Sequence, residues 1–125
     1  MTDAFTAKFA FAPERRYCLG AEEEVWTVNR KGLLVPAAPK VFTPGYEARL
    51  PGFKPELPSQ QIEAVTPVCA SLAELGDALR KNDATLKALG KEHGFTVCRD
   101  PVPTTPFAIE VFPTERYLRI QEKFG

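Results

Sequence analysis

Prolines set the main constraint on how this chain can fold. Twelve prolines occur among 125 residues, and they concentrate at 36–67 and 101–113. A proline fixes φ and has no N–H to donate, so it interrupts helices and central strands. Apolar residues are interleaved with these prolines, which indicates long extended connections and not disorder. We therefore expect a few regular elements joined by irregular segments, the longest of them at 36–58.

The composition is typical of one globular domain. A chain of 125 residues can bury a hydrophobic core, and 44% of its residues are apolar while 26% are charged. Sixteen basic and sixteen acidic residues give a formal net charge of +0, so the basic surplus of a nucleic-acid-binding protein is missing. No apolar stretch is long enough to cross a membrane. Neither nucleic acid nor a membrane is an expected partner.

The cysteines and the first residues favour a cytoplasmic location. Cys18, Cys69 and Cys98 are odd in number and have no metal-site spacing, which favours free or buried thiols in a reducing compartment over a metal or nucleophile role. The amino-terminal sequence has neither the apolar core nor the small-residue cleavage site of a signal peptide. We interpret residues 1–15 as a loose leader and 16–125 as one domain.

Three segments read as strands. Residues 16–28 are rich in apolar residues, and the following Asn-Arg-Lys-Gly at 29–32 is a turn signal that predicts a hairpin. Residues 60–68 alternate, which places Glu63 on the face opposite Ile62. A third strand is expected at 95–100. Within 60–68, the apolar side is the one that carries Ile62, Ala64 and Thr66.

Two segments read as helices. Ser71 followed by Glu74 forms a capping box, and Gly94 is a typical stop signal, so the longest helix is expected between them. Its predicted apolar stripe, interrupted by Asn82, consists of Leu72, Leu75, Leu79, Leu86 and Leu89. Thr114 is the expected N-cap of a final helix within 113–124. His93, at the end of the long helix, is interpreted as a cap or dipole partner in preference to a catalyst.

The most unusual feature is three adjacent glutamates within the stretch "LGAEEEVW" at 19–26. In a strand, Glu22 and Glu24 share one face and Glu23 takes the other, and the Cα atoms of the first two lie roughly 6.5 to 7 Å apart. Such a pair can hold Mg²⁺, which prefers oxygen ligands and completes its octahedron with substrate phosphates. Glu56 and Glu63 supply similar groups from a second segment. The alternative is that these glutamates are solvated or ion-paired.

These residues resemble the amino-terminal part of the type-2 glutamate–cysteine ligase family, whose members are also called carboxylate–amine ligases. The resemblance runs from about Cys18 to Gly125 through "LGAEEEVW", "FKPELPSQQIEAVTPVCASLAEL", "EHGF" and "PTERYLRIQEKFG". It implies a mixed α/β (α+β) fold, with an antiparallel sheet and helices on one face, similar to glutamine synthetase and the guanidino kinases. Residues 16–125 would form the amino-terminal part of such a domain.

The resemblance also implies a function. Family members use ATP and Mg²⁺ to phosphorylate a carboxylate, commonly that of glutamate, and an amine such as that of cysteine attacks the acyl phosphate. By position, Glu22, Glu24, Glu63 and Glu56 match metal-binding glutamates, and Thr66 matches a threonine that lines the ATP or substrate site. No catalytic residue is assigned.

Two departures from the family pattern leave alternatives open. The segment "ELPSQQIE" stands where the family reads closer to E-L-x-Q-S-Q-I-E, so the strand that carries Glu63 is expected to begin late. Family enzymes also continue well beyond Gly125, with histidines and arginines for phosphates and substrate. The alternatives are a non-catalytic, truncated or split homologue that forms a homo-oligomer or pairs with a complementing chain, and a structural α/β domain with an acidic rim.

Overall fold

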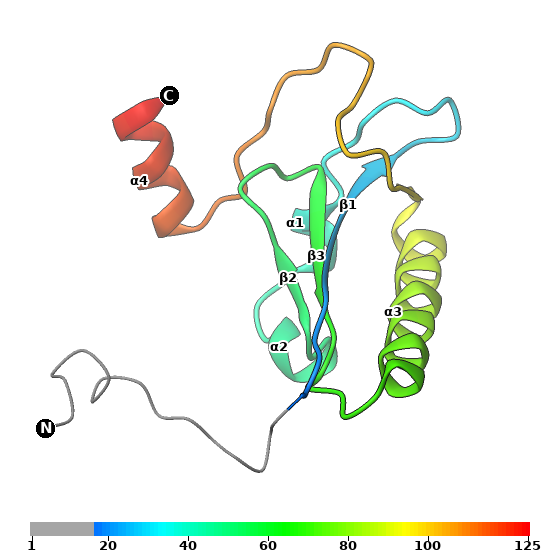
Figure 1. Cartoon of the computed structure of the whole chain (residues 1–125). Coiled ribbons are helices and arrows are strands. Elements are labelled where there is room, and N and C mark those ends of the chain that lie inside the picture. Colours follow the sequence, from blue (N-terminus) through cyan, green and yellow to red (C-terminus); the bar gives the residue numbers. More distant parts are fainter. Residues whose placement is uncertain (1–16) are drawn as a thin grey trace, which may run out of the picture.

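The computed structural model describes residues 17–125, so the expected leader at 1–15 lies outside the described residues. A four-stranded antiparallel sheet forms the centre of the described chain, and one long helix runs beside it (Figure 1). The elements, in chain order, are β1 (Glu22–Val28), α1 (Ala38–Val41), α2 (Tyr46–Arg49), β2 (Phe53–Pro55), β3 (Gln61–Val65), α3 (Leu72–His93), β4 (Thr96–Cys98) and α4 (Glu115–Phe124).

The sheet has the strand order β2-β3-β1-β4, and its pairings are antiparallel. One face is apolar because Val25, Ile62 and Ala64 are completely buried. These side chains share a hydrophobic core with α1 and with Leu86 and Leu89 of α3. We call this side of the sheet the helix face. The predicted mixed α/β class, an antiparallel sheet with helices, is confirmed.

Helix α3 begins and ends where its capping signals predict. The Ser71 hydroxyl accepts a hydrogen bond from the Glu74 backbone N–H at 3.2 Å, and the Glu74 carboxylate accepts one from the Ala70 N–H at 2.7 Å. Gly94 ends the helix in the left-handed region, with φ 79°. Because the carboxylate reaches residue 70 and not Ser71 itself, the box is displaced by one residue from the usual pattern.

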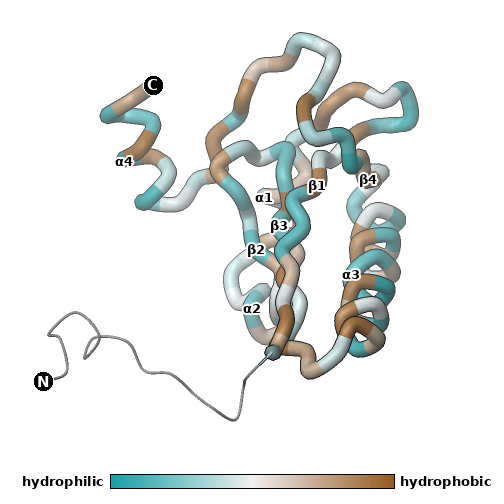
Figure 2. The backbone as a smooth tube through the Cα atoms, viewed as in Figure 1, coloured by the Kyte–Doolittle hydropathy of each residue, from teal (hydrophilic) through white to brown (hydrophobic). Residues whose placement is uncertain are grey.

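The predicted apolar stripe of α3 is wrong at its first residue, Leu72. Leu72 is 77% exposed, since the described chain does not cover the first turn of the helix. Asn82 interrupts the stripe as expected, because it is a polar residue buried at 8% exposure on the same helix as the buried Leu86 and Leu89. Hydrophilic and hydrophobic positions alternate around α3 (Figure 2).

The other sequence predictions differ from the structure in detail. The strand expected at 16–28 begins at Glu22, and the strand expected at 95–100 is limited to Thr96–Cys98. The irregular segment 36–58 contains the short elements α1, α2 and β2, which the proline content had obscured. The late start of β3 at Gln61 is confirmed.

The proline-rich segment after β4 is held against the residues that precede β3. The Ser59 N–H donates to the Glu110 carbonyl at 2.6 Å, and the Gln60 amide nitrogen donates to the Ala108 carbonyl at 2.9 Å. Phe107 packs edge-on against Trp26, with ring centroids 5.5 Å apart. Since Trp26 lies on the sheet face opposite the helix face, this segment covers one end of that face. The other end of this face carries Glu22, Glu24 and Glu63.

Candidate functional site

The strand register brings three charged side chains into one row. Glu24 of β1 lies directly opposite Glu63 of β3, and Glu63 lies opposite Lys54 of β2. Directly opposed residues on neighbouring strands have Cβ atoms roughly 4.5 to 5.5 Å apart. The Lys54 amino group contacts the Glu63 carboxylate at 3.0 Å, and the Glu63 side chain is only 12% exposed. The row therefore brings together two carboxylates that are 39 positions apart in the sequence.

Glu22 and Glu56 complete this group. Glu22 lies on the same face as Glu24, two residues earlier in β1, and its charge acts on Lys54. Glu56 directly follows β2, and both Glu24 and Glu63 act on its carboxyl group. We call Glu22, Glu24, Glu56 and Glu63, with Lys54 among them, the carboxylate cluster. Glu22, Glu24 and Glu63 thus lie on one face of the sheet, and the carboxyl group of Glu56 is close enough to feel the charges of Glu24 and Glu63.

The pKa values of two carboxyl groups of the cluster, Glu56 and Glu63, shift in opposite directions. Burial raises the pKa of Glu56, and its hydrogen bond to Glu63 raises the pKa further. Burial alone would raise the pKa of Glu63 as well, but hydrogen bonds with Lys54 and Glu56 outweigh it and lower the pKa. This divergence is typical of two carboxyl groups that are too close for both to ionise freely.

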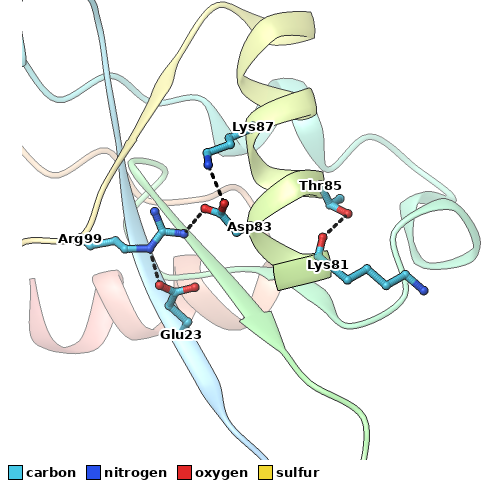
Figure 3. Close-up of polar contacts among 6 residues, drawn as sticks. All are labelled: Glu23, Lys81, Asp83, Thr85, Lys87 and Arg99. Atoms are coloured by element: carbon cyan, nitrogen blue, oxygen red, sulfur yellow. Dashed lines mark hydrogen bonds and ion pairs between the residues drawn. The ribbon is translucent and has the colours of Figure 1, made fainter. Parts of the chain in front are cut away.

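Glu23, the middle glutamate, serves a different purpose. It lies on the helix face, and its Oε1 atom accepts a hydrogen bond from Arg99 Nε at 2.5 Å (Figure 3). Arg99 also donates to Asp83 of α3 at 2.8 Å, and Asp83 pairs with Lys87 at 2.7 Å. This chain of ion pairs joins β1 to α3. The alternation predicted for the three glutamates is confirmed, with Glu23 in a structural ion pair.

Thr66 lies apart from the carboxylate cluster. Its hydroxyl oxygen accepts a hydrogen bond from the Ala21 N–H at 2.9 Å, and its own N–H donates to the Ala21 carbonyl at 2.9 Å. These bonds tie the start of β1 to the end of β3. The side chain is 7% exposed and borders a cavity beside α3. A role for Thr66 in lining an ATP or substrate site stays a prediction.

Sequence reasoning did not identify two residues of this region, Lys54 and Tyr117. Lys54 could have been found from the strand pattern "FKP", which predicts a polar side chain between two buried ones. Tyr117 of α4 donates a hydrogen bond to the Pro55 carbonyl at 3.2 Å. Burial and then the nearby Glu56 charge raise the pKa of Tyr117. No local signal connects α4 to β2, because this contact spans 62 positions.

The donor atoms of the cluster are oxygens, which suits Mg²⁺ and not a softer metal. Among residues 17–125, however, no three acidic, histidine or cysteine side chains are already arranged to hold a metal ion. Lys54 supplies the positive charge to Glu63 instead. Its side chain is 55% exposed, so it has room to swing away.

These features define a class of protein: a mixed α/β domain whose antiparallel sheet presents clustered carboxylates on one face. The sequence pattern described as "Glutamate-cysteine ligase family 2(GCS2)" matches residues 18–125, and the chain belongs to this family. Family membership indicates carboxylate–amine ligase activity in general. Comparisons with curated proteins and with solved structures gave no significant match. Across the part of the chain that the structure describes, no helix is long and apolar enough to cross a membrane.

Proposed function

We propose that this chain supplies the metal-binding face of an ATP-dependent carboxylate–amine ligase that works through an acyl phosphate. The observation that carries this proposal is the direct opposition of Glu24 and Glu63 in the sheet, with Glu22 and Glu56 beside them. Glutamate and an amine such as cysteine are the proposed substrates, from the family description. A glutamine synthetase-like or guanidino-kinase-like arrangement of the whole catalytic domain belongs to the same proposal.

Glu22, Glu24 and Glu63, together with Glu56, would hold Mg²⁺. The bound ions would neutralise the charge that accumulates when a triphosphate and a carboxylate meet. The protein's own contribution is to hold Glu22, Glu24 and Glu63 on a sheet where main-chain pairing fixes their spacing, with Glu56 directly after β2. Deprotonation of Glu56 and movement of Lys54 away from Glu63 would open the cluster to a cation.

The cluster by itself offers little to hold phosphates. Within residues 17–125, Lys54 is the basic side chain in hydrogen-bonding contact with the cluster. Positioning of the reacting groups supplies much of the rate in phosphoryl transfer. We therefore propose that residues 16–125 act as the amino-terminal part of a catalytic unit, completed by further residues, a second copy or a complementing chain. The alternative function is a non-catalytic interaction protein that keeps the sheet without turnover.

Metal binding can be tested with Mn²⁺ as a paramagnetic substitute for Mg²⁺. In NMR spectra of the 125-residue chain, Mn²⁺ should broaden the signals of residues around Glu24 and Glu63 first, and excess Mg²⁺ should reverse this. Glu24→Gln should weaken the effect at least about tenfold, since it removes a charged ligand. Glu23→Gln is the matched control, because the neighbouring carboxylate lies on the helix face. Equal loss in both variants, or in neither, would contradict the metal site.

Activity needs a second experiment. The chain alone should release no ADP from ATP, glutamate and an amine. Adding a polypeptide with the remaining part of the family domain should produce ADP release that Glu24→Gln abolishes and Glu23→Gln retains. ADP release by the chain alone would overturn the need for a complementing part but not the ligase assignment. Equal activity of Glu24→Gln and wild type in the mixture would remove the ligase assignment.

A further inference from the structure

Glu56 differs from the other glutamates of the carboxylate cluster in how its backbone is held. Glu22, Glu24 and Glu63 belong to β1 and β3, where pairing with a neighbouring strand fixes the backbone. Glu56 directly follows β2, and the paired residues of β2 with β3 end at Pro55. Contacts outside these strand pairs must therefore fix the position of this glutamate.

The backbone on both sides of Glu56 is held by residues far along the chain. The Tyr117 hydroxyl donates a hydrogen bond to the Pro55 carbonyl at 3.2 Å. The Phe112 N–H donates a hydrogen bond to the Leu57 carbonyl at 2.8 Å. Pro55 and Leu57 are the residues that directly precede and follow Glu56. Two residues of one distant segment therefore bracket this glutamate.

The same distant segment, residues 108–117, also holds the two residues that directly precede β3. We call it the clamp segment. The Ser59 N–H donates to the Glu110 carbonyl at 2.6 Å. The Gln60 side chain is 3% exposed, and its amide nitrogen donates to the Ala108 carbonyl at 2.9 Å. Breaking such a buried contact is costly, because it leaves a polar group unpaired. The clamp segment thus restrains the whole connection between β2 and β3.

Tyr117 joins α4 to this connection. It lies in the first turn of α4, where its N–H donates to the Thr114 hydroxyl at 3.4 Å, and its ring packs against the hydrophobic core. None of the residues of α4 is fully buried, and the helix lies at the β2 edge of the sheet, apart from the other helices (Figure 1). Tyr117 is therefore the residue through which α4 acts on the backbone beside Glu56.

We propose that Tyr117 is a positioning residue, which holds the Glu56 carboxylate in the carboxylate cluster through the Pro55 carbonyl. This role rests on the proposed metal site, because it concerns how one of the metal ligands is held. A carboxylate that is already held in place loses less conformational freedom when it binds a cation, so the cation binds more tightly. Tyr117 acts through the backbone and is not itself a ligand. Gln60 acts in the same way from the other side of Glu56.

Tyr117→Phe tests this role in the 125-residue chain, since it removes the hydroxyl and keeps the ring. With Mn²⁺ as the probe and NMR signal broadening as the measure, Tyr117→Phe should bind the ion about fivefold more weakly than wild type, because one hydrogen bond is lost. Glu56→Gln should also weaken binding, and adding Tyr117→Phe to it should cause no further loss, because the two residues act as one unit. An equal loss from Tyr117→Phe with and without Glu56→Gln would overturn the positioning role.

Tyr46→Phe is the matched control. This tyrosine packs against the same core, and its hydroxyl forms no hydrogen bond with another of the residues 17–125. Removing that hydroxyl should therefore leave Mn²⁺ binding unchanged. A loss as large as that of Tyr117→Phe would show that the packing of the core, and not the bond to Pro55, sets the affinity, and would overturn the proposal.

The backbone amide signals of the metal-free chain give an independent measure. Tyr117→Phe should shift the signals of Glu56 and Leu57, whereas Tyr46→Phe should leave them almost unchanged. Gln60→Met, which removes the side-chain amide, should shift the same signals and weaken Mn²⁺ binding. Unshifted signals of Glu56 and Leu57 in Tyr117→Phe would overturn the positioning role. Absence of Mn²⁺ binding to wild type would instead contradict the proposed metal site, and the metal-free signals would still decide whether Tyr117 positions Glu56.

Discussion

Replacing Glu56 with glutamine tests the raised pKa of this carboxyl group in the carboxylate cluster. Because the folded-state pKa of Glu56 is raised, the folded protein retains a proton that the unfolded chain releases. This stabilising contribution is fully present below the unfolded-state pKa and is lost as the pH rises through the folded-state pKa. Glutamine keeps an N–H donor toward Glu63 at every pH. The free energy of unfolding of Glu56→Gln should therefore not fall as the pH rises through the folded-state pKa of Glu56.

The size of this change in stability depends on how deeply Glu56 is buried. One proton bound only in the folded state changes the free energy of unfolding by at most about 1.4 kcal/mol per pH unit. Glu56 is only partly buried, so solvent screens the interaction and reduces the total to about 0.5 to 1 kcal/mol. Relative to wild type, Glu56→Gln should gain this amount between pH 4 and pH 8. The lowered pKa of Glu63 acts in the opposite direction, because its contribution is lost as the pH falls.

Urea unfolding at a series of pH values measures this difference. Trp26 is the only tryptophan and is 9% exposed, so its fluorescence reports unfolding of the sheet. Glu122→Gln, an exposed change on α4, is the control and should follow wild type at every pH. A difference between Glu56→Gln and wild type that stays constant from pH 4 to pH 8 would refute the raised pKa of Glu56.

Two further predictions concern the scaffold of the site. Ile62→Ala should lower the free energy of unfolding by about 2 to 5 kcal/mol, because this completely buried side chain belongs to the strand that carries Glu63. A loss below about 1 kcal/mol in urea unfolding would show that the surroundings of Ile62 are poorly packed. Arg99→Met removes the ion pairs with Glu23 and Asp83, so it should lower the free energy of unfolding by about 1 kcal/mol or less. This loss of stability should be smaller in 0.5 M salt, because salt screens the ion pairs of wild type. A cost that does not depend on salt would indicate lost packing instead.

The sequence by itself determined the features that depend on neighbouring residues. The alternation of a strand separated Glu23 from Glu22 and Glu24, because successive side chains point to opposite faces. Ser71 and Gly94 set the limits of α3, since a side-chain acceptor and a left-handed glycine satisfy the free groups at helix ends. These relations act within a few residues and need no knowledge of the fold. The family resemblance from Cys18 onward added the expectation of a metal site.

Only the tertiary structure decided which distant residues meet. The register of β1 with β3 places Glu24 opposite Glu63, and a shift by one residue would have sent Glu63 to the helix face. The pairing of β2 with β3 inserts Lys54 into the carboxylate cluster. The packing of α3 against the sheet buried Asn82, although its chemistry favours solvent. Register and packing arise from contacts among segments far apart in the chain, so no local pattern of residues could have specified them.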